Sequence, residues 1–277
     1  MPLTDADKRR ISNEAAYHVR KKIKLEKYLR RNINKFFVNQ NGIIKIRLSN
    51  GNVYNASEAI PELEKILEEH YDRTSLVFIP FVLNFLNKNL NRITGDGKIN
   101  IDNNILNATL RTKIKREISN TAQIITNTTN RIIGKAIKDL DSKEVTEFSK
   151  RSEYVFEKLE AKRRMRSDVT AITETNKAAE SSKNATAKEY FDNLISNVRK
   201  AGIDGTIATL LTSGKSWVTM MDNNVRSWHA NALFQERRFD EPFEVMREFL
   251  MFPGDTDLGA SPRNVNRCRC ASIPFLI

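Results

Sequence analysis

Two stretches near the C-terminus hold the most distinctive residues of this chain. Residues 215–229 read KSWVTMMDNNVRSWH, and residues 239–270 read FDEPFEVMREFLMFPGDTDLGASPRNVNRCRC. Together they contain both tryptophans, both cysteines and one of the three histidines among 277 residues. Rare residues placed so closely indicate one small, tightly specified unit. We therefore expect a small α+β C-terminal domain over residues 201–277.

Short elements are expected within this domain. Trp217 to Met220 has strand character, and Asp222 is a good N-cap for a short helix. On that helix Asp222, Arg226 and His229 would stand at positions i, i+4 and i+7, so they would project on the same side. Residues 253–255, Pro-Gly-Asp, predict a tight turn.

Four residues of this domain are candidate metal ligands: His229, Cys268, Cys270 and Asp222. Thiolates and imidazole suit zinc, and a bound ion would help a domain with little core of its own. One alternative is a pair of buried thiols beside a capped helix, without a metal. Another is a cysteine nucleophile with a histidine base, although no other part of the chain indicates a substrate pocket.

The N-terminal region, residues 1–100, is predicted to be basic and helical with a small β-hairpin. Residues 6–38 show the apolar spacing of an amphipathic helix. The alternating run Ile43–Leu48 and the Asn50-Gly51 pair predict a hairpin near residues 43–54, because asparagine and glycine tolerate positive φ. Further helices are expected over residues 57–71 and 75–93.

Residues 101–200 are predicted to form a long helical region of the bundle or coiled-coil type. A narrow apolar stripe follows steps of three and four residues: Leu106, Leu110, Ile114, Ile118, Thr121, Ile125, Thr128, Ile132, Ala136 and Leu140. Such a stripe is more often a seam between helices than a binding site. The expected fold class is therefore mainly α, with long amphipathic helices and small β elements.

The net charge of +12 is unevenly distributed. Residues 1–35 carry eleven Lys and Arg against four Asp and Glu, and residues 101–200 carry twenty against fourteen. Residues 201–277 carry eight against nine, so the C-terminal domain is nearly neutral. Basic helices favour non-specific contact with nucleic acid through counterion release. A solvated surface without such a partner is the alternative.

Two classes of protein are disfavoured by the sequence. The longest apolar run, residues 76–86, contains Pro80 and Asn84 and is too short to span a bilayer, so we predict a buried helix there. Two cysteines two residues apart exclude a disulfide scaffold and favour a reducing compartment.

The order of motifs in the C-terminal stretches resembles the phage Mu F-like head morphogenesis family, whose members are minor head proteins of tailed phages. The pattern runs W-x-T-x-x-D-x-x-x-R-x-x-H, then F, P-G-D, G-A-[ST] and C-R-C. The matching residues are Trp217, Thr219, Asp222, Arg226, His229, Phe239, Pro253, Gly254, Asp255, Gly259, Ala260, Cys268, Arg269 and Cys270. The upstream run Ile172–Thr175 resembles the short T-E element of the family. The family usually has asparagine directly before C-R-C, where this chain has Arg267.

The resemblance implies a non-enzymatic minor head protein with no catalytic residues. Family members are associated with the portal vertex inside the procapsid and bear on head assembly, DNA packaging or ejection. The implied partners are the portal protein, DNA, and the scaffold or major capsid protein, and the implied locations are the virion interior and, during assembly, the host cytoplasm. The candidate DNA contacts are Arg9, Arg10, Lys21, Lys22, Arg163, Arg164 and Arg166.

Two other functional classes stay open. A genome-delivered enzyme or toxin-like effector could use the His/Cys cluster, but a nuclease needs clustered carboxylates and histidines, and the three histidines are far apart in sequence. A free nucleic-acid-binding regulator would show a helix-turn-helix or zinc-finger spacing, and neither pattern is present.

Overall fold

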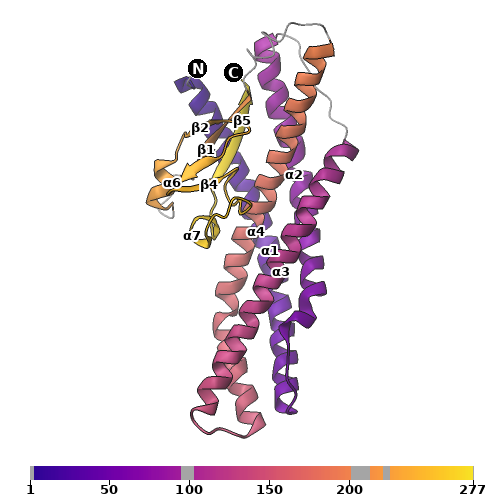
Figure 1. Cartoon of the computed structure of the whole chain (residues 1–277), viewed down its shortest axis with the longest axis vertical. Coiled ribbons are helices and arrows are strands. Elements are labelled where there is room, and N and C mark those ends of the chain that lie inside the picture. The colour runs from indigo at the N-terminus through magenta and orange to yellow at the C-terminus, as the bar shows by residue number, and fades with distance from the viewer. Residues whose placement is uncertain (1–2, 95–102, 201–212, 221–224, 277) are drawn as a thin grey trace. The chain divides into compact units, whose positions relative to one another are not determined.

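The computed structural model describes residues 3–94, 103–200, 213–220 and 225–276. Long helices dominate it: α1 (Asp5–Ser49), α2 (Ile60–Thr94), α3 (Asn103–Asp141) and α4 (Phe148–Lys200), with the 3-10 helix η1 (Ala56–Ala59) before α2 (Figure 1). The C-terminal part contains β1 (Ser213–Val218), α6 (Ser227–Asn231), β2 (Glu236–Arg238), β3 (Phe243–Val245), β4 (Glu248–Leu250), α7 (Pro262–Val265) and β5 (Ala271–Leu276). A mainly helical protein with a small α+β C-terminal part is therefore confirmed.

Contacts between residues divide the chain into two compact units. The sheet unit comprises residues 1–25, 71–112 and 172–277, and the helical unit comprises residues 26–70 and 113–171. Every boundary falls inside a long helix, so each of these helices contributes one segment to each unit. The units thus cut across the three consecutive regions, 1–100, 101–200 and 201–277, that were expected from the sequence.

An antiparallel sheet with strand order β2-β1-β5 forms the centre of the sheet unit, and β3 and β4 form a separate antiparallel pair. On the central strand β1, Lys215 stands opposite Arg237 of β2 and Pro274 of β5. Gly214 precedes it, and a Cβ atom there would lie 2.4 Å from the ring of Phe275. Only glycine allows this close approach between the two strands.

Both faces of β1 are covered by apolar side chains. Successive residues of a strand point to opposite faces. Trp217 accordingly packs in a core cluster with Phe243, whereas Val218 packs in another cluster with Ile11 and Ala15 of α1. Every residue of β5 and all but the first residue of β1 are buried. Neither strand therefore shows the alternation of buried and exposed residues that marks a sheet with one solvated face.

The apolar stripe of α3 lines the core of the helical unit, as predicted for a seam between helices. Ile114, Ile118, Ile125 and Ile132 are each at most 8% exposed. Ile132 packs in a cluster that also contains Leu159 of α4. The side chains at positions 106 and 110, which begin the predicted stripe, lie outside the described residues.

The predicted β-hairpin near residues 43–54 is wrong, because its first strand is the last part of α1, which ends at Ser49. Ile44 is fully buried in the core of the helical unit together with Ile132 and Leu159. Burial of this helical face outweighs the β propensity of the isoleucines, which is a weak and context-dependent preference.

The Asn50-Gly51 pair caps α1 instead of forming a hairpin turn. The amide of Gly51 donates to the carbonyl of Leu48 at 3.1 Å, and that of Asn52 donates to the carbonyl of Arg47 at 2.9 Å. Gly51 has a φ of 74°. This Schellman cap needs a left-handed residue, as a hairpin turn does, so the same dipeptide serves either structure.

The two helices expected over residues 57–71 and 75–93 form the single helix α2, which contains Pro80. Within the apolar run at residues 76–86, Phe78, Val82 and Leu86 are at most 1% exposed, which confirms a buried helical face there. Leu76, in contrast, is 77% exposed.

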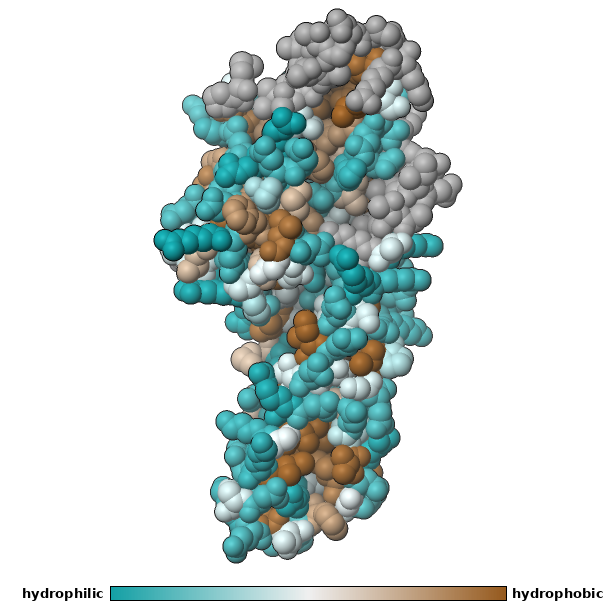
Figure 2. Space-filling view, in the orientation of Figure 1, coloured by the Kyte–Doolittle hydropathy of each residue, from teal (hydrophilic) through white to brown (hydrophobic). Residues whose placement is uncertain are grey.

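Hydrophilic side chains cover most of the described surface on the face shown in Figure 2, with smaller hydrophobic patches between them. Within the described ranges, no helix is long and apolar enough to cross a membrane.

Candidate metal centre

His229, Cys268 and Cys270 converge in the sheet unit, as the sequence predicted. The Nδ1 atom of His229 lies 3.7 Å from the Sγ atom of Cys268 and 3.4 Å from that of Cys270. The three ligand atoms lie within 4.8 Å of one another, and each side chain is at most 4% exposed. This group of one imidazole nitrogen and two sulfur atoms could hold a metal ion.

Short elements and main-chain hydrogen bonds hold the three ligands. His229 lies in α6, and the cysteines lie between α7 and β5. Arg226, the N-cap residue of α6, donates a hydrogen bond to the carbonyl of Asn266, which links α6 to the loop that carries the cysteines. The amide of Cys268 donates to the carbonyl of Val265 at 3.2 Å, which closes the turn after α7.

A chain of hydrogen bonds determines which nitrogen of His229 faces the sulfur atoms. The side-chain Nδ2 of Asn264 donates to the carbonyl of Val245 at 3.2 Å and to the carboxylate of Glu248 at 2.6 Å. Its oxygen therefore faces Nε2 of His229 at 3.3 Å and the Nε1–H of Trp228 at 2.7 Å. Because this oxygen can only accept, Nε2 carries the ring proton. The lone pair of Nδ1 is thus left for a metal ion.

Asn264→Ala is expected to weaken metal binding by about 10- to 100-fold, because the ring of His229 loses the partner that selects its tautomer. A competition titration of the full chain against a chromophoric chelator measures this affinity. Asn193→Ala removes a side chain that, among the described residues, bonds only within α4; it is the matched control and should leave the affinity unchanged. A folded Asn264→Ala protein with the affinity of the wild type would contradict the expected role of this residue.

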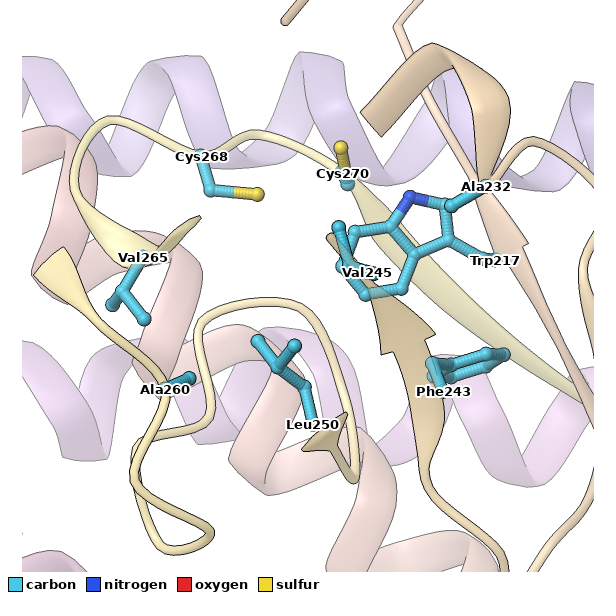
Figure 3. Close-up of a cluster of buried hydrophobic side chains, with 9 residues drawn as sticks. All are labelled: Trp217, Ala232, Phe243, Val245, Leu250, Ala260, Val265, Cys268 and Cys270. Atoms are coloured by element: carbon cyan, nitrogen blue, oxygen red, sulfur yellow. The ribbon is translucent and has the colours of Figure 1, made fainter. Parts of the chain in front are cut away.

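The protonation of the two thiols is linked. A hydrogen bond from Cys270 lowers the pKa of Cys268 well below its usual range, although burial opposes this shift. The same hydrogen bond and burial raise the pKa of Cys270. The buried indole N–H of Trp217 has no oxygen or nitrogen acceptor among the described residues, and its nitrogen lies on the Cys270 side of the ring (Figure 3). A cation that keeps Cys270 as a thiolate would give this N–H an acceptor.

The space beside the three ligands is small. A cavity of ≈ 30 Å³ is lined by His229, both cysteines, Met220 and Val225, among others. That volume holds about one water molecule, whereas small-molecule sites usually measure about 300–1,000 Å³. Among the described residues, this space therefore suits an ion with one further small ligand.

The Pro-Gly-Asp turn is fixed against α4. The carbonyl of Pro253 accepts a hydrogen bond from Nδ2 of Asn176 at 3.1 Å. Gly254 has a φ of 92°, and a Cβ atom there would lie 3.2 Å from the same nitrogen, so both conformation and space favour glycine. The buried carboxylate of Asp255 accepts from the amides of Met251 and Asp257 and thereby closes the turn.

A buried ion network, consisting of Lys22, Glu180 and Lys183, attaches α1 and α4 to the segment that carries Cys270. Lys22 Nζ lies 2.5 Å from the Glu180 carboxylate and donates to the carbonyl of Cys270 at 3.1 Å. Lys183 Nζ lies 2.7 Å from the same carboxylate oxygen and donates to the carbonyl of Ser272 at 3.0 Å. The other oxygen of Glu180 accepts from the amide of Ser272 at 2.9 Å. The segment that carries Cys270 is thus tied to both helices.

The expected helical spacing of Asp222, Arg226 and His229 is not observed. Asp222, the fourth candidate ligand, lies outside the described residues. Arg226 is extended, with φ −65° and ψ 144°, because it caps a helix that begins only at Ser227. Of the other residues that match the family motif, Trp217 and Thr219 are buried, whereas Arg269 is half-buried between the two cysteines.

Two of the seven candidate DNA contacts, Lys22 and Arg166, are wrong because their side chains are buried. Lys22 belongs to the buried ion network, and Arg166 donates to Oγ1 of Thr129 at 2.6 Å and lies over the ring of Phe37. The other five candidates are exposed or half-buried: Arg9, Arg10, Lys21, Arg163 and Arg164.

No sequence pattern marks Asn264 or Glu248 as supports of the cluster, or Glu180 and Lys183 as the partners of Lys22. Asn264 precedes Cys268 by four residues, but a single asparagine has no periodic pattern that marks it. Glu180 follows Lys22 by 158 residues, so no local spacing predicts their contact.

Comparison of the chain with protein-family models, with curated proteins and with solved structures gave no match. A functional proposal therefore rests on the sequence motifs and on the geometry of the cluster.

Proposed function

We propose that this chain is a non-enzymatic minor head protein of a tailed phage, with a zinc ion in its C-terminal domain. The observation that carries the proposal is the shared location of the motif residues. Trp217, His229, the Pro-Gly-Asp turn and the two cysteines all lie in the sheet unit, in or beside the cluster and against α4. Residues that match a family motif for a common structural reason are expected to lie together in this way.

The backbone at Arg267 gives further support to the resemblance. Arg267 has a φ of 55°, and its amide donates to Oγ1 of Thr173 at 3.1 Å. Asparagine adopts this left-handed conformation more readily than most other residues with a side chain. The family usually has asparagine at this position. The left-handed backbone of Arg267 in this chain is therefore the conformation that the family's asparagine would favour.

Zinc is the ion that the cluster fits best. Bond lengths of about 2.0 Å to nitrogen and about 2.3 Å to sulfur at a tetrahedral angle place a nitrogen and a sulfur ligand about 3.5 Å apart. The two N···S distances of 3.7 and 3.4 Å lie on either side of this value. Two thiolates and an imidazole also favour zinc over calcium or magnesium. A water molecule or Asp222 would complete the coordination.

A structural role for the ion is favoured over catalysis. Three protein ligands with one open position also occur in catalytic zinc sites, and this supports the alternative of a delivered enzyme or effector. The cavity of ≈ 30 Å³ argues against that alternative, because it is far smaller than a usual small-molecule site. We assign no catalytic residue.

The proposed setting is the interior of the virion at the portal vertex, after assembly in the host cytoplasm. The portal protein is the principal proposed partner, and the scaffold and major capsid proteins are further candidates. The basic helices suit a protein that lies beside packaged DNA, where contact with phosphates is independent of sequence.

Co-expression with the portal protein of the same genome tests this proposal. We expect the chain to co-purify with portal rings after nuclease treatment and at a salt concentration that releases DNA. Loss of the complex on nuclease treatment would mean that DNA alone bridges the two proteins, and this result would overturn the proposed function. Hydrolytic activity that depends on His229 would favour the enzyme alternative.

A further inference from the structure

A basic groove lies between α1 and α4 of the helical unit. It has a volume of ≈ 650 Å³ and is open to solvent. Its lining includes Lys27, Arg30 and Arg31 from α1, and Arg164 and Asp168 from α4. Four cations and one carboxylate thus line a concave surface, which concentrates positive potential within the groove.

Three of the four cations are uncommitted. Within the described ranges, the side chains of Lys27, Arg31 and Arg164 make no ion pair or hydrogen bond, and all three are exposed. Arg30 pairs with Asp168 at 2.7 Å. The preceding arginine on α4, Arg163, does not line the groove, and its side chain donates hydrogen bonds to Glu160 and Asn34.

The arrangement of these three cations suits an extended anion. Lys27 and Arg31 stand one turn apart on the same face of α1, with Cβ atoms about 6 Å apart. Arg164 faces them from the other side of the groove. A phosphodiester chain carries evenly spaced charges and is narrow enough to be contacted from both sides, whereas a lipid surface is broad and flat.

We infer that this groove binds the phosphate backbone of DNA through Lys27, Arg31 and Arg164. The inference rests on the proposed function, which gives the protein a position beside packaged DNA. It adds a location for the contact and two residues, Lys27 and Arg31, that were not among the candidates from the sequence. Because the contacts are made to phosphates, they carry no preference for base sequence.

The test is the salt dependence of binding to a short fluorescent duplex of mixed sequence. Each lost phosphate contact reduces the slope of log K against log salt by about 0.9, so the triple variant Lys27→Gln, Arg31→Gln, Arg164→Gln should lose about 2 to 3 from that slope. We expect its affinity to fall at least about tenfold at moderate salt. Asp168→Asn removes the only acidic lining residue and should tighten binding, an effect that misfolding cannot produce.

The matched control is the triple variant Arg131→Gln, Lys135→Gln, Lys138→Gln, which removes the same charge from exposed positions on α3. Its slope should change by less than half as much as that of the groove variant. Three results would each overturn the inference. They are equal losses of salt slope in the two triple variants, no binding of DNA by the wild type, and a groove variant that loses more affinity for anionic lipid vesicles than for DNA. Co-purification with the portal, measured on the same variants, should persist, so failure of the groove is distinguishable from failure of the proposed function.

Discussion

Replacing Cys268 and Cys270 together by serine is expected to abolish stoichiometric zinc binding and to destabilise the sheet unit. A zinc ion present at about 1,000 times its Kd stabilises the folded state by about 4 kcal/mol. For a protein of this size, that loss lowers the thermal midpoint by roughly 8–16 °C. The core around Trp217 and Phe243 persists in the variant, so we expect a weakened fold rather than an unfolded domain.

Elemental analysis and thermal melts of the full chain, with and without a chelator, measure both effects. The chelator should lower the midpoint of the wild type and leave that of the double variant unchanged. His70→Gln, which alters a fully buried histidine in the helical unit, is the control: it should reduce stability without reducing zinc content. Wild-type protein that holds less than about a tenth of an equivalent of zinc, and that does not respond to added zinc, would refute the metal centre.

The sequence predicted those features that depend on local spacing. The stripe on α3 is visible because buried residues of a helix recur every three or four positions, as at Ile118, Ile125 and Ile132. The convergence of His229, Cys268 and Cys270 could be predicted because histidine and cysteine are rare in this chain and have few other roles when grouped. The correct fold class followed from these two kinds of pattern.

Features that depend on distant contacts could not be predicted in this way. Lys22 resembles a solvated helix residue until Glu180 is placed beside it, and Arg166 likewise contacts Thr129 of another helix. Isoleucines such as Ile44 suit a strand in isolation, and only the packed core decides for a helix. Asp222, which the motif includes, lies outside the described residues, so its predicted role as a ligand stays a prediction.

Glu180→Ala is expected to destabilise the sheet unit by about 3–5 kcal/mol, because it removes the carboxylate that two buried ammonium groups contact. Lys22 and Lys183 are at most 2% exposed, and their Nζ atoms lie 2.5 and 2.7 Å from the same carboxylate oxygen. The amide of Ser272 also loses its acceptor. Both tryptophans lie in the sheet unit, so urea denaturation followed by tryptophan fluorescence reports on this unit directly.

The effect of Glu180→Ala should decrease as the pH is raised towards about 8 and should then stay constant. Burial lowers the pKa of Lys183 to about 8, although Glu180 acts to raise it, and removal of Glu180 should lower this pKa further. The lysine of the unfolded chain titrates near 10.4, so between the two values the unfolded state binds more protons. Above about pH 8 this raises the stability of both proteins alike. Below about 8, only the variant gains stability as the pH rises, because its Lys183 loses the proton that the wild-type lysine still keeps, so the difference between the two proteins shrinks there.

The control for this prediction is Asp192→Ala, which breaks the exposed pair between Lys188 and Asp192 on the same helix. Exposed pairs at this spacing contribute about 0.3–0.5 kcal/mol, so the control should differ little from the wild type at any pH. A loss below about 1 kcal/mol in Glu180→Ala, or a loss independent of pH, would mean that water reaches the two lysines. In that case Glu180 would not be the group that holds α1 and α4 to the segment carrying Cys270.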